Sequence, residues 1–105
     1  MKSFLLVAES DPVLADVYWR FLTRQGYEVE TAKAGLECLT KLRSRLPDVL
    51  VMDVDLPWGG GDGVLSWLRD EHNSEDVPVV LTATLPAISR LDGFRTASNV
   101  LCLPK

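Results

Sequence analysis

The sequence alternates short apolar runs with longer stretches whose apolar residues recur at helical spacing, and this alternation constrains the fold more than any other feature. A continuous apolar run such as Phe4–Ala8 is typical of a strand that is buried on both faces of a sheet. Consecutive strands that are joined through a helix lie parallel, with right-handed crossovers. We therefore expect an α/β fold in which helices cover both faces of one parallel sheet.

Five strands and four helices are expected in a single domain over residues 1–105. Five parallel strands of this kind commonly take the doubly wound order 2-1-3-4-5, and such sheets bind ligands at the carboxyl ends of their strands. The expected strands are Phe4–Ala8, Tyr27–Thr31, Val49–Met52, Val77–Ala83 and Val100–Leu103. The expected helices are 12–25, a second helix that ends near Leu46, a third that is capped by Asp62, and Pro86–Thr96.

Helix boundaries are marked by residues that favour caps and stops. Asp11 followed by Pro12 predicts an N-cap with proline at the first helical position, and Gly26 predicts the end of that helix. Pro47 is expected to end the second helix, and Asp62 to cap the third. The apolar positions of the three helices are Leu14, Val17, Tyr18, Phe21 and Leu22, then Leu36, Leu39, Leu42 and Leu46, then Val64, Leu65 and Leu68.

Composition excludes several classes of protein. The net charge is −4 and the 11 basic residues are scattered, whereas a nucleic-acid surface needs clustered Lys and Arg. No apolar run approaches the ~20 residues of a membrane span, and the N-terminus lacks the apolar core of a signal peptide. The expected compartment is the cytoplasm, with Cys38 and Cys102 as reduced, buried thiols.

Polar side chains follow the apolar runs at what becomes one edge of the sheet. Carboxylates suit a hard cation such as Mg²⁺, and a carboxylate beside that ion can attack a phosphoryl group to form an acyl phosphate. A hydroxyl and a lysine at the same edge can neutralise the phosphoryl oxygens. The residues at this edge are Glu9, Ser10 and Asp11, then Asp53 and Asp55, then Thr82, then Lys105.

Each of these residues also has a purely structural interpretation. Asp53 can cap a turn, Thr82 can be a β-branched strand end, and Lys105 can be a solvated chain end. Asp11 is better explained as a helix N-cap than as a metal ligand. The set favours a site because residues from four separate strands must agree in position.

Four sequence segments resemble the receiver domain of two-component response regulators, and the resemblance covers nearly the whole chain. The segments read FLLVAESDP, PDVLVMDVDLP, VPVVLTA and LPK. The resemblance implies a flavodoxin-like fold, Mg²⁺ as cofactor, and a histidine kinase or phosphotransfer protein as the phosphoryl donor. It further implies that Asp53 is the phosphoacceptor, Thr82 the switch hydroxyl and Lys105 the active-site lysine, with Glu9, Asp53 and the backbone carbonyl of Asp55 around the metal.

The site departs from the family pattern in two ways. The family usually has two adjacent acids after the first strand, and here the second, normally a direct metal ligand, is Ser10. Asp11 reaches the metal only if the loop shifts. The family usually has an aromatic switch residue three positions before the lysine, and in this chain that position is occupied by Cys102.

Two further departures concern the surroundings of the site. The stretch from Pro57 to Gly63 is two residues longer than the usual P-x-x-D-G, so residues 58–61 are expected to form a lengthened loop. The family also continues past the lysine into a fifth helix that these residues do not include. Without that helix, part of one sheet face is uncovered, which favours association, for example as a homodimer.

Three functions fit these features. The first is a phosphorylatable receiver that signals to a downstream output protein or to a C-terminal segment outside this sequence. The second is a pseudo-receiver, an interaction module with impaired Mg²⁺ binding and phosphotransfer, which Ser10 and Cys102 favour. The third is a small phosphatase with an aspartate nucleophile, suggested by the D-x-D spacing of Asp53 and Asp55, although such enzymes usually carry that motif on their first strand.

Overall fold

The computed structural model describes residues 2–71, 77–84 and 99–104, and the helix expected at Pro86–Thr96 lies outside these ranges. Five parallel strands form one sheet in the order β2-β1-β3-β4-β5, which confirms the expected fold and strand order. The strands are β1 (Phe4–Ala8), β2 (Glu28–Ala32), β3 (Val49–Asp53), β4 (Val79–Ala83) and β5 (Val100–Pro104). The described helices are α1 (Pro12–Arg24), α2 (Gly35–Ser44) and α3 (Gly60–Glu71).

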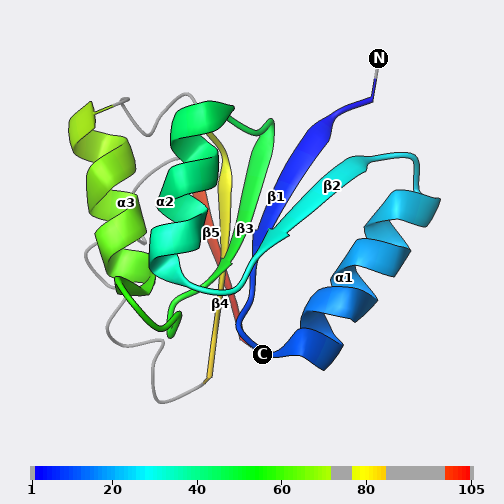
Figure 1. The fold of residues 1–105 in the computed structure, drawn as a ribbon, viewed down its shortest axis with the longest axis horizontal. Helices are drawn as coiled ribbons and strands as arrows, with labels where there is room; N and C mark the ends of the chain where they lie inside the picture. Colours follow the sequence, from blue (N-terminus) through cyan, green and yellow to red (C-terminus); the bar gives the residue numbers. More distant parts are fainter. Residues whose placement is uncertain (1, 72–76, 85–98, 105) are drawn as a thin grey trace.

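The sheet lies between α1 on one face and the pair α2 and α3 on the other (Figure 1). The core lies mainly where α2 and α3 pack on the three central strands. No helix in the described ranges is long and apolar enough to cross a bilayer. The largest fully buried apolar side chains are Leu6, Leu42, Leu50, Met52, Leu65, Leu68 and Leu81.

Helix α1 begins and ends where its cap residues predict. The Asp11 carboxylate accepts a hydrogen bond from the backbone N–H of Val13 at 2.9 Å, and Pro12 occupies the first turn. At the other end, Gly26 has a φ of +96°, a conformation that a side chain disfavours. Its N–H donates to the Thr23 carbonyl and helps to close the last turn.

The same helix buries less than its apolar pattern predicted. None of its residues is fully buried, and Val17 and Phe21 are 54% and 60% exposed. Leu14, Tyr18 and Leu22 recur every four residues and are half-buried. Val17 and Phe21 lie beside that stripe, and α1 packs mainly on β1 and the edge strand β2. Within the described residues, no helix or strand covers the side chains of Val17 and Phe21.

Helix α2 also differs from its prediction, because it ends at Ser44 instead of Leu46. Pro47 disfavours helical geometry at the residue before it, and the backbone is already extended at Arg45. Leu46 is consequently exposed, as is Leu36 at the other end of the helix. The buried positions of α2 are Gly35, Cys38 and Leu42.

Helix α3 begins at Gly60, two residues before the expected cap Asp62, so part of the expected loop is helical. Gly61 explains the early start: a Cβ there would lie 2.7 Å from the Cα of Val54, so only glycine allows this approach. Tertiary packing here outweighs the poor helix propensity of glycine. The expected inward positions of α3, Val64, Leu65 and Leu68, are buried.

Strand β4 starts at Val79, two residues later than expected, because Pro78 has no N–H to donate.

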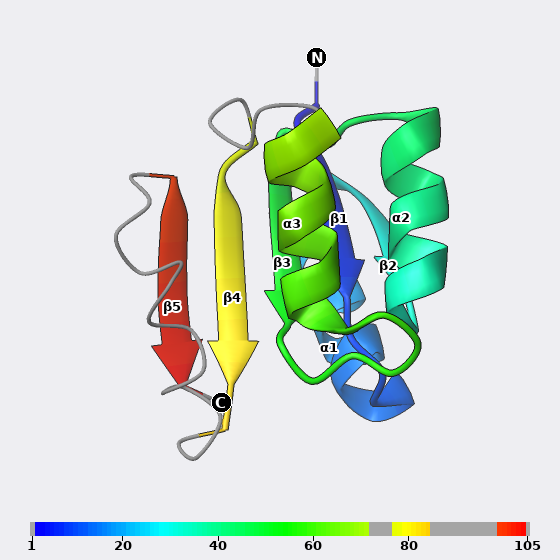
Figure 2. The same cartoon turned by 90° about the vertical axis from the view of Figure 1, so that its left-hand side faces the viewer.

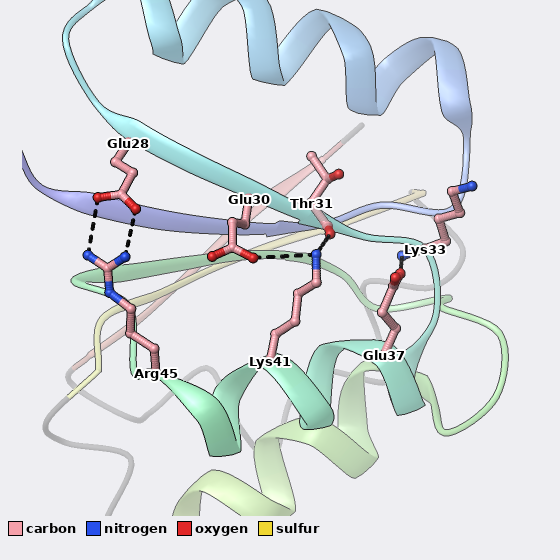
Figure 3. A network of polar contacts seen from close by, with 7 residues as sticks. All are labelled: Glu28, Glu30, Thr31, Lys33, Glu37, Lys41 and Arg45. Atoms are coloured by element: carbon pink, nitrogen blue, oxygen red, sulfur yellow. Dashed lines mark hydrogen bonds and ion pairs between the residues drawn. The ribbon is translucent and has the colours of Figure 1, made fainter.

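Charged side chains tie the edge strand β2 to α2 (Figure 3). The Arg45 guanidinium donates to both carboxylate oxygens of Glu28, at 2.6 and 3.2 Å. The Lys41 ammonium donates to the Thr31 carbonyl at 2.6 Å and lies 3.6 Å from the Glu30 carboxylate. Charge along an exposed edge strand disfavours pairing with a strand from another molecule.

Candidate functional site

Three buried polar side chains stand together at the carboxyl end of the sheet. Glu9, Asp53 and Thr82 are 2%, 4% and 7% exposed, and they are the buried polar or charged residues within the described ranges. Glu9 directly follows β1, Asp53 is the last residue of β3 and Thr82 is the last but one of β4, and these strands are neighbours. Figure 2 shows the carboxyl ends of these strands at the same edge of the molecule. Burying carboxylates costs folding free energy, so such a group points to function.

The strand register places Asp53 between the other two. Ala8 pairs with Met52 at the end of the β1–β3 ladder, and Glu9 and Asp53 are the residues that directly follow this pair. On the other side, Asp53 pairs directly with Thr82. The sequence predicts that these three residues and Lys105 converge at one edge of the sheet, and the structure brings Glu9, Asp53 and Thr82 to the ends of neighbouring strands.

Backbone amides hold the two carboxylates. The N–H of Asp55 donates to Oδ1 of Asp53 at 3.0 Å, and the N–H of Asp11 donates to Oε2 of Glu9 at 3.0 Å. Each carboxylate therefore accepts a hydrogen bond from the residue two positions later. Hydrogen bonds from N–H groups to carboxylates are stronger than neutral ones and orient the side chain.

The two residues that were considered as substitute metal ligands are both exposed. Oδ1 of Asp11 accepts hydrogen bonds from the N–H groups of Val13 and Leu14, so this carboxylate acts as the cap of α1. Ser10 lies between Glu9 and Asp11 at the surface. The structure thus agrees with the interpretation of Asp11 as an N-cap.

The last strand brings its own candidates to this edge. Cys102 pairs with Leu81 and is half-buried against the core, one register step from Thr82. Pro104 pairs with Ala83. Lys105, the expected active-site lysine, lies outside the described residues, so its role stays a prediction.

The donor set suits Mg²⁺ with water ligands better than an ion held by side chains alone. Across the described ranges, no three His, Cys, Asp or Glu side chains gather closely enough to hold a metal. Glu9 and Asp53 supply two carboxylates from adjacent strands. Mg²⁺ usually keeps several waters and binds through one or two carboxylates, so two carboxylates and a backbone carbonyl fit it.

One feature of the site had no sequence prediction. The loop that follows Asp53 reaches the start of α2, where the N–H groups of Gly35 and Leu36 donate to the carbonyls of Pro57 and Trp58, both at 2.8 Å. Such backbone contacts leave no side-chain pattern. The available signal was the glycine at the start of the helix, a residue type that permits close backbone approach.

A family model for the response regulator receiver domain matches residues 5–98. The chain belongs to this family. Receiver domains are in general non-enzymatic signalling modules of two-component systems; they interact with histidine kinases or phosphotransfer proteins and typically bind Mg²⁺.

Individual relatives are distant in sequence and close in fold. The polar-differentiation response regulator DivK of Brucella ovis is 29% identical over 80 residues, which are 76% of this chain and 65% of that protein. This chain thus aligns with somewhat less than two thirds of that relative. A putative response regulator from Chloroflexus aurantiacus is 29% identical, with a TM-score of 0.85 over 100% of this chain and 86% of the other. TrrA of Thermotoga maritima, solved in complex with Mg²⁺ and BeF, is 25% identical, with a TM-score of 0.80 over 100% of this chain and 87% of the other.

Proposed function

We propose that this receiver domain accepts a phosphoryl group on Asp53 and signals through the conformational change that follows. The observation that carries the proposal is the burial of Asp53 between Glu9 and Thr82 at the carboxyl edge of the sheet. A buried carboxylate flanked by a second carboxylate and a hydroxyl has the groups that phosphoryl acceptance needs. Membership of the receiver family supports the same conclusion.

The Asp53 carboxylate acts as the nucleophile in this proposal. One of its oxygens forms a bond to phosphorus while the bond from phosphorus to the donor breaks; for a histidine kinase or phosphotransfer protein, the donor atom is a histidine nitrogen. The Asp55 N–H, 3.0 Å from Oδ1, holds the carboxylate in a fixed orientation. Mg²⁺, when bound by Glu9, Asp53 and the Asp55 carbonyl, supplies positive charge against the phosphoryl oxygens.

The remaining groups stabilise the product and report it. Thr82 is the register partner of Asp53, so its hydroxyl can donate to a phosphoryl oxygen after a small shift. We assign Lys105 to the same task as a point charge. Cys102 occupies the aromatic switch position, and its side chain is too small to carry the conformational signal. The signal instead passes through the β4 backbone and the segment that follows it. The recipient is an output protein or a further segment of the same protein.

Mass spectrometry after incubation with a small-molecule phosphodonor and Mg²⁺ tests the proposal. The wild-type chain should gain the mass of one phosphoryl group, and Asp53→Asn should gain none. Asp55→Asn is the matched control, because the proposal uses only the backbone of residue 55. Equal labelling of wild type and Asp53→Asn would overturn the assignment.

A pseudo-receiver is the second candidate, and the observation that favours it is the exposed Ser10 in place of the usual acid. A neutral hydroxyl is a weaker ligand for Mg²⁺ than a carboxylate. A Mg²⁺ titration separates the two functions. Binding that disappears in Asp53→Asn supports phosphotransfer, and no binding by the wild type supports an interaction module.

A further inference from the structure

The loop between β3 and α3 crosses to the start of α2, although the two segments are distant in the sequence (Figure 2). Ala34, the N-cap residue of α2, provides no side-chain hydrogen bond. The first N–H groups of a helix have no partner within the helix. In this chain the N–H groups of Gly35 and Leu36 donate instead to the carbonyls of Pro57 and Trp58. The loop is therefore the cap of α2.

The contact depends on the absence of a side chain at residue 35. A Cβ built on Gly35 would lie 2.6 Å from the Trp58 carbonyl oxygen and 3.1 Å from backbone carbons of Gly59. The φ of Gly35 is not in the left-handed region, so the requirement for glycine is one of space. Any other residue pushes the loop away from α2.

The loop is held at both of its ends. It turns through three successive residues with positive φ, Trp58, Gly59 and Gly60 at +53°, +116° and +66°, and two of these are glycines, which adopt this conformation readily. At the far end, the Gly61 N–H donates to the Val54 carbonyl at 3.0 Å. Because both ends of the loop are fixed by backbone contacts, a displacement at Trp58 is expected to reach the residues just after Asp53.

We propose that Gly35 is a positioning residue for the acidic site: it lets the loop dock on α2 and thereby fixes the backbone of Asp55. The inference rests on the proposed function, in which the Asp55 carbonyl binds Mg²⁺ and its N–H holds Asp53. Only two residues, Leu56 and Pro57, separate Asp55 from Trp58. Leu56 is buried, so the short segment from Asp55 to Trp58 is anchored in the core.

The test compares Gly35→Ala with Gly63→Ala by Mg²⁺ titration in a calorimeter. Both changes add one methyl group to a helix, but a Cβ at Gly63 has no atom within 4 Å. Gly35→Ala should weaken Mg²⁺ binding about tenfold, the size of effect seen when groups that orient metal ligands are removed. Gly63→Ala should bind Mg²⁺ as the wild type does, because its added Cβ meets no neighbouring atom. Circular dichroism confirms that both variants are folded.

A second measurement needs only the wild type and covers the case in which Gly35→Ala does not fold. Hydrogen exchange reports the protection of the Gly35 and Leu36 amides, and Mg²⁺ should increase it because the ion and the contact order the same loop. Mg²⁺ binding that neither depends on Gly35 nor changes this protection overturns the positioning role and leaves the proposed function intact. No Mg²⁺ binding by wild type overturns both.

Discussion

Asp53 and Thr82 are register partners on adjacent parallel strands, and the N–H of Val54 donates to the Thr82 carbonyl at 2.9 Å. The backbone of the proposed phosphoacceptor is thus joined to the backbone of the proposed switch residue. If the Thr82 hydroxyl moves toward a phosphoryl group on Asp53, as the proposed function requires, we expect the end of β4 to move with it. A signal can leave the site along β4 without an aromatic side chain.

The first prediction concerns this signal. Thr82→Ala should strongly weaken the response to phosphorylation, because it removes the hydroxyl that donates to a phosphoryl oxygen. Cys102→Ala should change the response little, because Cys102 is small and pairs with Leu81, not with the switch residue Thr82. Hydrogen exchange at residues 84–96, with and without the phosphodonor, measures the response. Loss of the response in Cys102→Ala and its survival in Thr82→Ala would contradict the argument.

The strand order and the convergence of Glu9, Asp53 and Thr82 were predictable from the sequence. Each depends on a local signal, an apolar run followed by a polar residue, and on the rule that parallel strands end at one edge. The N-cap Asp11 was predictable for the same reason, since its signal lies in two adjacent residues.

Features that depend on contacts between distant segments were not predictable. The exposure of Val17 and Phe21 depends on what packs over α1, which the spacing of apolar residues does not record. The start of α3 at Gly60 depends on the close approach of Gly61 to Val54. The contact of Gly35 with the Trp58 carbonyl was not predictable either, because a contact between two backbone groups leaves no pattern of residue types in the sequence.

The second prediction concerns the departure at residue 10. Ser10→Asp should tighten Mg²⁺ binding, because a charged oxygen replaces a neutral hydroxyl where the family usually has a carboxylate, and affinity for hard cations rises with ligand charge. Calorimetry measures the change, and Ser10→Asn controls for size without charge. Equal affinity in wild type and Ser10→Asp would mean that the wild-type site already has the carboxylates it needs.

The third prediction concerns pH and the ion pair between Glu28 of β2 and Arg45, the residue that directly follows α2. Hydrogen bonds from Arg45 hold the pKa of Glu28 below its ordinary value of 4.5. A carboxyl whose pKa is lowered by folding stabilises the native state above its unfolded pKa, and this stabilisation is lost as the pH falls through its folded pKa. The difference in stability between wild type and Arg45→Gln should therefore be present at neutral pH and shrink as Glu28 is protonated.

An NMR titration of the Glu28 carboxyl measures this directly. Arg45→Gln should raise the pKa of Glu28 toward 4.5. Arg43→Gln is the matched control: Arg43 lies in the last turn of α2, two residues before Arg45. Both guanidinium groups lie over an aromatic ring, that of Trp67 for Arg43 and that of Phe4 for Arg45. Arg43→Gln should leave the Glu28 pKa unchanged, and an equal rise in both variants would show that general charge, not the paired hydrogen bonds, lowers the pKa.

The fourth prediction concerns the reactivity of the two thiols. Burial raises the pKa of Cys38 to about 12, with a further contribution from the Glu37 carboxylate. The thiolate is the reactive form, so at pH 8 native Cys38 is almost entirely the unreactive thiol. A thiol-exchange reagent should therefore modify the half-buried Cys102 first and Cys38 only on unfolding. Cys102→Ala should remove the fast phase, and Cys38→Ala should preserve it.

The same pKa shift predicts an alkaline loss of stability. A thiol whose pKa is raised by folding stabilises the native state below its unfolded pKa, here near 9.0, and this contribution falls as the pH rises toward about 12. Unfolding by urea at pH 8 and pH 10 measures the decrease in wild type. Cys38→Ala should lose less stability than wild type over this interval, because the group that ionises only in the unfolded state is gone. An equal loss in both proteins would show that Cys38 ionises as readily in the folded chain as in the unfolded one.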